Sequence, residues 1–343
     1  FETSLKSRLI YVFAIPDEWH KDCLKVGETT LEEDDGNFPL PNSEVLNKAA
    51  CDRIDQYTKT AGIAYNLLHT EMTVFFKGGT ISSFNDKQVH SVLERSGVKK
   101  KTFDTVKGAN EWFCCDLETV KKAIHAVKNG RNSLNASDIS YTQTPIIFRP
   151  EQQAAIDKTK KQFKKGAQML WNAKMRFGKT LCALRVARDL EMRRTIILTH
   201  RPVVDESWFE DFGKIFYDRT DYHYGSRTKG EDFTSLERLA KKGDRYVYFA
   251  SMQDMRGAQL VGGKFDKNNE VFSTDWDFLI VDEAHEGTRT ELGESVIKEL
   301  TKANTKVLKL SGTPFNLLDD YTEEETYTWD YTCLLYTSPS PRD

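Results

Sequence analysis

The residues best suited to chemistry lie in a loop in the second half of the chain. Residues 173–180 read Ala-Lys-Met-Arg-Phe-Gly-Lys-Thr, after an apolar run at 169–171 and before a helical pattern at 181–190. In a strand, loop and helix of this order, backbone N–H groups and the positive end of the helix surround phosphates. Lys179 would reach the outer phosphates and the Thr180 hydroxyl would meet Mg²⁺, so the segment predicts a nucleotide site.

Two positions of this loop depart from the glycine-rich pattern of phosphate loops. Ala173 stands at the first glycine position, and Arg176 stands where a further glycine is common, while Gly178 is kept. Taken alone, the loop could therefore be an ordinary one that happens to contain Gly-Lys-Thr.

Acidic and hydroxyl residues follow two later apolar runs. Asp282 and Glu283 come directly after the run at 278–281, and Ser311 and Thr313 follow the next such run. The carboxyl ends of parallel strands meet at one edge of a sheet, where Asp282 can hold Mg²⁺ beside the phosphate loop. Glu283 would polarise the attacking water. The alternative is that Asp282 and Glu283 belong to an ordinary charged turn after a strand. The Ser311 segment argues against this alternative, because it follows the next apolar run at the same edge of the sheet.

Alternating strand-like and helical segments must position these motifs. The apolar runs lie at 169–171, 195–199, 246–249, 278–281 and 307–310. Near-continuous apolar strands suit a parallel sheet that is covered on both faces. We therefore expect a doubly wound α/β domain over residues 145–331.

Six segments in order resemble the superfamily-two helicases, above all the motors of type I and type III restriction enzymes. They are 149–152, the phosphate loop, 199–202, 251–253, the Asp-Glu-Ala-His segment 282–285, and 311–314. The resemblance implies a RecA-like P-loop fold that hydrolyses ATP with Mg²⁺. It implies that Gln152 reads adenine with support from Arg149.

The same resemblance implies a nucleic-acid partner. The residues that would touch the backbone of single- or double-stranded DNA are Thr199, His200, Arg201, Ser251 and Gln253. Ser311 and Thr313 would couple hydrolysis to domain motion. Backbone contacts do not read sequence, and RNA is a weaker alternative.

The two ends of the chain predict a fragment. Motors of this class hydrolyse ATP between two RecA-like domains, and the second domain supplies arginines to the transferred phosphate. No second domain follows, so we expect weak turnover by this chain. Residues 332–343 look like translated adapter sequence and are left out of the fold prediction.

The first part of the chain predicts a small α+β domain. Strand-like runs at 9–15 and 72–76 are separated by segments with helical spacing. A polar stretch follows a helical pattern at 120–127. We place this domain at residues 1–128 and a linker at 129–144.

A set of residues in this first domain resembles the GIY-YIG endonuclease superfamily, in its branch with a Lys-Val-Gly second motif. The set comprises Tyr11, Gly27, Arg53 and the Glu-Trp-Phe segment at 111–113. The resemblance implies phosphodiester hydrolysis: Tyr11 orients or deprotonates water, Arg53 stabilises negative charge, and a carboxylate holds one divalent metal.

Two positions depart from that family's pattern. Lys25 replaces the second tyrosine, and Asp86 stands where the branch has the metal-binding glutamate, which leaves Glu111 as the second metal candidate. Tyr11 could instead be a core residue and Arg53 a solvated one. The alternative is therefore a remodelling helicase whose first domain grips DNA without cutting it.

Composition supports a soluble globular protein. Hydrophobic residues make up 39% and charged residues 29% of the chain, and the formal net charge is −3. The six cysteines are scattered without a Cys-x-x-Cys pair, which favours reduced thiols, and His69 and His90 are expected to be structural. We expect a cytoplasmic protein without membrane contacts, in a restriction or phage-defence system with modification subunits as further partners.

Overall fold

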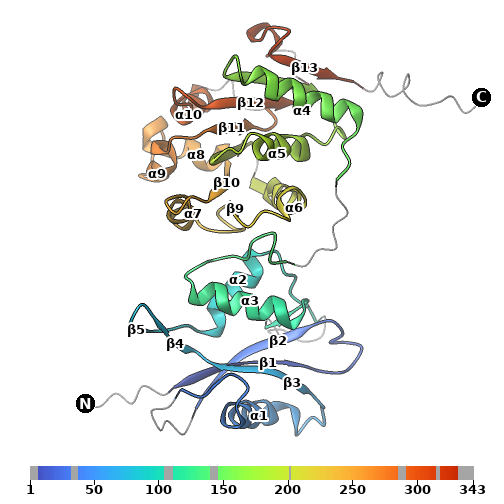
Figure 1. Ribbon diagram of the computed structural model, residues 1–343, viewed down its shortest axis with the longest axis vertical. Helices are drawn as coiled ribbons and strands as arrows, with labels where there is room; N and C mark the ends of the chain where they lie inside the picture. Colours follow the sequence, from blue (N-terminus) through green and yellow to red (C-terminus); the bar gives the residue numbers. More distant parts are fainter. Residues whose placement is uncertain are drawn as a thin grey trace, which may run out of the picture. The chain divides into compact units, whose positions relative to one another are not determined.

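The chain divides into two compact units, Phe1–Leu134 and Asn135–Asp343 (Figure 1). The computed structural model describes residues 7–31, 38–103, 111–139, 146–200, 202–284, 291–313 and 317–330. The division falls inside the segment for which a linker is predicted. Residue 145 and the tail at 332–343 lie outside the described residues.

The first unit is built on an antiparallel sheet with strand order β3-β1-β2-β6. Its strands are β1 (Arg8–Ala14), β2 (Leu24–Thr30), β3 (Asn66–Met72) and β6 (Trp112–Phe113). The central strand β1 is apolar at five consecutive positions, and all of them are buried. Such a strand needs cover on both faces.

Three helices supply that cover (Figure 1). They are α1 (Glu44–Thr58), α2 (Asp86–Arg95) and α3 (Leu117–Lys128). Leu46, Ala50 and Ile54 of α1 pack in one cluster with Tyr11 and Phe13 of β1. Helices α2 and α3 pack against each other on the opposite face in Figure 1. The small α+β domain expected from the sequence is therefore present, although one strand differs.

The strand predicted at 72–76 is two strands. The backbone N–H and the hydroxyl of Thr73 both donate to the carbonyl of Arg8, at 2.9 and 3.0 Å. The chain leaves the sheet after this end of the β1–β3 ladder and continues as a separate hairpin of β4 (Val74–Lys77) and β5 (Thr80–Ser83). The hairpin turns through Gly78 and Gly79, both with positive φ.

The second unit contains a seven-stranded sheet in which every pairing is parallel, with order β13-β7-β12-β11-β8-β10-β9. Its strands are β7 (Gln168–Ala173), β8 (Arg194–Thr199), β9 (Tyr222–Gly225), β10 (Arg245–Ser251), β11 (Phe278–Val281), β12 (Lys306–Ser311) and β13 (Thr326–Trp329). The five predicted strands are confirmed. The two edge strands, β9 and β13, are not foreseen from the sequence.

Helices cover both faces of this sheet (Figure 1). Those on one face are α4 (Pro150–Gln162), α5 (Lys179–Asp189) and α6 (Asp205–Phe216). Those on the other are α7 (Phe233–Ala240), α8 (Met252–Arg256), α9 (Asn269–Ser273) and α10 (Glu291–Leu300). Short 3-10 turns lie at Pro202–Val204, Gln259–Val261 and Leu318–Asp320. The RecA-like doubly wound α/β fold is thus confirmed for this unit.

Within the described ranges, no helix is both long and apolar enough to cross a membrane.

Candidate nucleotide and phosphodiester sites

The predicted phosphate loop lies between β7 and α5, as the motif requires. The first strand ends at Ala173 and the helix begins at Lys179. Gly178 has a φ of +87°, and a Cβ on it would lie 2.7 Å from Nε2 of Gln152. A side chain at this position would therefore meet both backbone strain and a steric clash.

Arg176 occupies a second left-handed position in the loop, with a φ of +68°. A non-glycine residue there costs about 1 kcal/mol of strain. This geometry explains why glycine is common at the position and how the arginine departs from the pattern. The side chain of Arg176 is exposed.

Gln152 and Arg149 hold this loop from the start of α4. The Gln152 amide accepts from the backbone N–H of Arg149 at 2.9 Å and donates to the carbonyl of Phe177 at 2.6 Å. The Arg149 guanidinium donates to the carbonyls of Phe177 and Arg176, at 3.0 and 3.2 Å. The same guanidinium lies over the ring of Trp329 on β13, at 5.9 Å. The residues predicted to contact adenine are thus tied directly to the phosphate loop.

The two polar side chains that end the loop bond to protein oxygens. Lys179 Nζ donates to the carbonyl of Ala173 at 2.9 Å, and the Thr180 hydroxyl donates to Asp211 at 2.6 Å. Asp211 is on α6 and is not foreseen from the sequence. Its signal would have been the helical spacing that places it three residues after Trp208, on the same face.

Asp282 sits at the carboxyl end of β11 among groups that disfavour its charge. Burial, and then the neighbouring Glu283 carboxylate, raise the pKa of Asp282 to about 6, while Lys179 opposes the rise. The indole N–H of Trp208 donates to Asp282 at 3.4 Å. Glu283 has a φ of +50°, and its backbone N–H donates to Asp282 at 3.0 Å. A buried carboxylate under this repulsion fits the role of a ligand to a divalent cation.

The predicted coupling residues lie next to this loop. The backbone N–H of Thr313 donates to the Ser311 hydroxyl at 3.2 Å. A Cβ on Gly312, between them, would lie 4.0 Å from Lys179 Nζ and 3.8 Å from the Ala173 carbonyl. The structure therefore brings this segment against the end of the phosphate loop.

The residues predicted to touch nucleic acid lie at the ends of neighbouring strands. Thr199 of β8 pairs in register with Ser251 of β10. The side chain of Thr199 is 2% exposed, and the Ser251 hydroxyl caps α8 by accepting from the N–H of Asp254. Gln253 is exposed. Thr199 and Ser251 thus hold the edge in place, whereas Gln253 lies on the surface.

His200 and Arg201 complete the set of residues predicted to touch nucleic acid. His200 has a buried Nδ1 without a hydrogen-bond partner in the described part of the chain. Arg201 lies outside the described residues, as do His285 and Pro314 of the neighbouring motifs.

A second cluster of polar groups gathers on the sheet of the first unit. Tyr11 on β1 faces Gly27 on β2, and a Cβ on this glycine would lie 2.7 Å from the Tyr11 hydroxyl. The Tyr11 ring therefore requires a glycine opposite it. Burial raises the pKa of Tyr11, against the hydrogen bond from Tyr57 and the charge of Arg53. Tyr11, Gly27 and Arg53, predicted from distant parts of the sequence, are thus brought together.

Tyr57 is a site residue that the sequence did not reveal. It lies one turn after Arg53 on α1, is hydrogen-bonded to Tyr11, and is near Glu111. Lys25 Nζ lies 4.8 Å from the centre of the Tyr57 ring and 3.2 Å from Glu111. The four-residue spacing between Arg53 and Tyr57 was the available signal, since it puts both on one helix face.

The two predicted metal-binding carboxylates have different surroundings. Glu111 is neutralised by Lys25. Burial, and then the charge of Glu28, raise the pKa of Asp86. The N–H of Asp86 also donates to Glu28 at 3.3 Å, and Glu28 is a further residue that the sequence did not indicate. Repulsion between carboxylates favours a cation at Asp86 more than at Glu111, whose charge is offset by Lys25.

Neither His69 nor His90 lies in a cluster of metal ligands among the described residues. His90 donates to the carbonyl of Val26 at 2.8 Å, and both His90 and His69 are buried. Among the described residues there is no group of three or more His, Cys, Asp or Glu side chains that could hold a metal ion. Any cation at Asp86 would therefore keep most of its coordination to water or substrate.

Comparisons with known proteins match the second unit. The family described as "Type III restriction enzyme, res subunit" matches residues 145–316. RM.MpnORF110P C-terminus of Mycoplasma pneumoniae (strain ATCC 29342 / M129 / Subtype 1), a type II restriction enzyme and methyltransferase by name, is 28% identical over 162 residues. This alignment covers 45% of the chain and 22% of that protein, so the chain spans about a fifth of this relative's length.

Solved structures also align with the chain. The UvsW helicase from bacteriophage T4 aligns over 75% of the chain and 99% of its own length, with 13% identity and a TM-score of 0.39. The Sulfolobus solfataricus SWI2/SNF2 ATPase core in complex with dsDNA covers 54% of this chain and 37% of its own, with 16% identity and a TM-score of 0.38. With the family match over half of its length, the chain belongs to the family of type III restriction enzyme res subunits and carries that family's helicase-like ATPase domain.

Proposed function

We propose that this protein is an ATP-driven DNA motor of the restriction type whose first unit is a metal-dependent DNA endonuclease. The observation that carries the motor is the single edge of the parallel sheet that holds Lys179, Thr180, Asp282, Glu283 and the segment around Ser311. The observation that carries the nuclease is the meeting of Tyr11, Arg53 and Tyr57 near Glu111. Arg53 and Glu28 also line one groove.

In the motor, the residues at the sheet edge divide the work on ATP. Lys179 exchanges its bond to the Ala173 carbonyl for the outer phosphates. Thr180 and Asp282 would hold Mg²⁺, which neutralises phosphate charge when bound. Glu283 accepts a hydrogen bond from the attacking water and orients it. Ser311 and Thr313, packed against the loop, transmit the loss of the outer phosphate to the rest of the protein.

The nuclease chemistry follows from the state of the Tyr11 phenol. Because burial raises its pKa above the ordinary value, Tyr11 keeps its proton at neutral pH. The phenol therefore orients the attacking water, with Tyr57 fixing the direction of its hydroxyl. Arg53 is exposed and stabilises the charge that builds on the phosphate. Asp86 would hold the divalent cation, which assists departure of the leaving oxygen when bound.

DNA can approach this site from a groove beside α1. The groove has a volume of about 680 Å³ and is lined by residues of β1, β2 and α1. Its wall carries three cations, Arg8, Lys48 and Arg53, together with three carboxylates, Glu28, Glu44 and Asp52. The cations can hold a strand through its phosphates, and a divalent cation would offset the carboxylates.

Nicking of supercoiled plasmid with Mg²⁺ or Mn²⁺, without ATP, tests the nuclease. We expect Tyr11→Phe and Arg53→Ala each to lower the nicking rate by about 100-fold or more, the range seen when one stabilising donor is removed. Tyr65→Phe and Arg95→Ala are matched controls in the same unit and should nick like the parent. Equal loss in controls and site variants would point to misfolding, and unchanged nicking in the site variants would point to a contaminating nuclease.

The second candidate function is a DNA-gripping module attached to a remodelling motor. The Lys25–Glu111 ion pair favours it, because a lysine stands where the second tyrosine is expected and neutralises one predicted metal ligand. Under this alternative, the parent chain binds DNA but does not nick it with either metal. In that case, Arg53→Ala should weaken DNA binding while Tyr11→Phe leaves it unchanged.

A further inference from the structure

Two cysteines of the first unit face each other where β2 meets β6. The ladder pairs Leu24 with Phe113 and Lys25 with Trp112, so the next step places Cys23 opposite Cys114. Their sulfur atoms are 3.3 Å apart and in hydrogen-bond contact. The two residues are 91 positions apart in the chain, and only the folded sheet brings them together.

The two thiols differ in their surroundings. Cys23 is 3% exposed, and its thiol also lies 3.3 Å from the carbonyl of Lys21. Burial, and then the neighbouring Cys114, raise the pKa of Cys23 to about 11, with Asp22 adding to the rise and Lys101 opposing it. Cys114 is exposed. One thiol of the pair is therefore open to reagents in solution, and the other is a protonated neighbour within reach.

We propose that Cys23 and Cys114 form a reversible disulfide when the protein meets a peroxide. Opposed residues of an antiparallel pair have Cα atoms about 4.5–5.5 Å apart, which lies within the range of disulfides. The sulfur atoms need to approach by about 1.3 Å to reach bonding distance, a shift that side-chain rotation can supply. The inference rests on this geometry and not on the proposed nuclease activity.

The chemistry proceeds in two balanced steps. The Cys114 thiolate attacks a peroxide oxygen: an S–O bond forms, the O–O bond breaks, and hydroxide leaves to become water. The Cys23 sulfur then attacks the Cys114 sulfur: the S–S bond forms, the S–O bond breaks, and water leaves with the Cys23 proton. The two thiols lose two electrons and two protons, and hydrogen peroxide is reduced to two waters. A dithiol reductant reverses the change.

The cross-link would brace the strand that presents Glu111. This residue precedes β6, and the N–H of Val26 on β2 donates to its carbonyl at 3.2 Å. Trp112 is buried against Phe13 of β1 and the ring of His20. A covalent bond one residue beyond β6 therefore fastens the short strand, which pairs with β2 at two residues, to the centre of the sheet.

Peptide mapping of the whole chain tests the proposal. The reduced protein is exposed to hydrogen peroxide, its remaining thiols are alkylated, and it is digested with trypsin without reductant. Trypsin leaves Cys23 in residues 22–25 and both Cys114 and Cys115 in residues 108–121. We expect these two peptides to be joined, to separate on addition of dithiothreitol, and to remain apart in a sample that was never oxidised.

Two serine variants assign the bond. Cys114→Ser should abolish the joined peptide, and the matched control Cys115→Ser should keep it. Oxidation should also raise the midpoint of thermal unfolding of the first unit by roughly 5 °C or more in the parent and in Cys115→Ser, because the bond closes a long loop. Full alkylation of Cys23 after oxidation, a bond between Cys114 and Cys115, or a bond between two chains would overturn the proposal. Because Cys114 is exposed, its serine variant does not disturb the core.

Discussion

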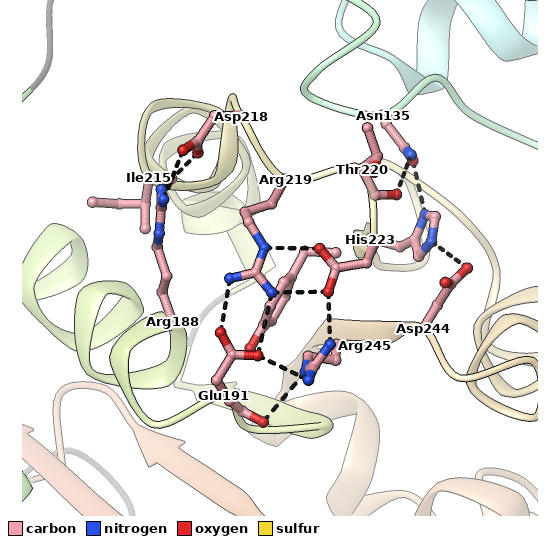
Figure 2. Close-up of polar contacts among 12 residues, drawn as sticks. Asn135, Arg188, Glu191, Ile215, Asp218, Arg219, Thr220, His223, Asp244 and Arg245 are labelled. Carbon is pink, nitrogen blue, oxygen red and sulfur yellow. Dashed lines mark hydrogen bonds and ion pairs between the residues drawn. The ribbon is translucent and has the colours of Figure 1, made fainter.

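Carboxylates at the two edges of the parallel sheet in the second unit have pKa values that are shifted in opposite directions. At the amino edge, Arg219 and Arg245 each pair with both Glu191 and Asp221, at distances between 2.7 and 2.9 Å (Figure 2). The ring of Tyr222 lies between the two guanidinium groups, 5.0 and 5.8 Å from them. The hydrogen bond from Arg219 is the largest of the effects that lower the pKa of Asp221 to about 2.

At the carboxyl edge, two neighbouring carboxylates repel each other. Asp282 is buried next to Glu283 and has its pKa raised to about 6. Arg176 and Glu283 both hold left-handed backbone conformations. Thus the same sheet stabilises a carboxylate at one edge and penalises another at the opposite edge.

This difference indicates which edge is built for a ligand. A closed network of ion pairs needs nothing from outside, and it stiffens the loops before β8, β9 and β10. Strain and repulsion persist only where the surrounding fold holds them in place, and a bound cation or phosphate relieves them. A shifted pKa does not by itself distinguish the two edges, because carboxylates at both edges have shifted pKa values. The direction of the shift distinguishes them, since the pKa of Asp221 is lowered and that of Asp282 is raised.

Replacing Lys179 with alanine tests the carboxyl edge with the largest expected effect. Lys179 lies beside Asp282 and donates to the backbone carbonyl of Ala173, which a phosphate can replace. We expect the Kd for a fluorescent ATP analogue with Mg²⁺ to rise by about 100-fold, the effect of losing a buried charged contact of about 3 kcal/mol. Lys165→Ala, on an exposed turn, is the control. Unchanged affinity in Lys179→Ala would remove this loop as the phosphate site.

Replacing Asp282 with asparagine should stabilise the protein while it destroys the cation site. A pKa of about 6 in the folded state against about 4 when unfolded corresponds to a penalty of about 2 to 3 kcal/mol at pH 7. Because this pKa is raised, the penalty is absent below about pH 4, grows as the pH rises, and is complete above about pH 6. Urea unfolding without nucleotide should therefore show a stability gain of about 2 kcal/mol at pH 7 that shrinks towards pH 5.

The direction of that change is the decisive result. A loss of stability in Asp282→Asn at pH 7 would mean that the charged form is favoured in the fold, contrary to the repulsion from Glu283. A gain that does not depend on pH would place its origin in packing rather than in charge.

The phosphate loop and the segments at Asp282 and Ser311 could be placed in the fold from the sequence because each of them follows a strand. In a parallel sheet the carboxyl ends share one edge, so Thr180, Asp282 and Ser311 can be placed near one another before any coordinates are known. The strands themselves were legible because buried parallel strands are continuous apolar runs, as in Phe278–Val281. Pattern and topology agree wherever burial is complete on both faces.

The residues that the sequence did not reveal come from elements that reach the sites sideways. Asp211 and Trp208 approach from α6, and Tyr57 approaches from α1. Their positions depend on how a helix packs on a sheet, which residue spacing alone does not fix. The edge strands β9 and β13 were missed because these strands of four residues mix polar and aromatic side chains and give no continuous apolar run, although β9 is buried along its whole length.

Replacing Arg219 with alanine tests the amino edge. It removes bonds to Glu191 and Asp221 and leaves these two acidic groups close together. Since the groups are partly exposed, solvent screening limits the expected loss of unfolding free energy to about 1–2 kcal/mol. The Kd for the ATP analogue should stay within about twofold of the parent, because the network lies at the other edge. A large loss of nucleotide affinity in a folded variant would contradict the separation of the two edges.

The same network should lose its contribution in acid. The pKa of Asp221 is lowered in the fold, so the stability it supplies is present above about pH 4 and is lost as the pH falls towards 2. The difference in urea midpoint between the parent and Arg219→Ala should therefore narrow below pH 4. This dependence is opposite in sign to the one expected for Asp282.

Replacing Asn135 with alanine is the smallest test of the amino edge. Asn135 is the first residue of the second unit, and its side chain joins the His223 ring at 2.8 Å to the carbonyl of Thr220 at 3.0 Å (Figure 2). On its other side, His223 contacts Asp244 at 3.0 Å, so one partner remains after the change. We expect a loss of less than about 1 kcal/mol, because water can reach the half-buried position and replace the amide. Hydrogen exchange should detect the loss as faster exchange of the backbone N–H groups at 220–223, while Ser137→Ala leaves these rates unchanged. If exchange instead quickened at the phosphate loop, the two edges would be coupled through the sheet, and the charge network would be part of the motor rather than its support.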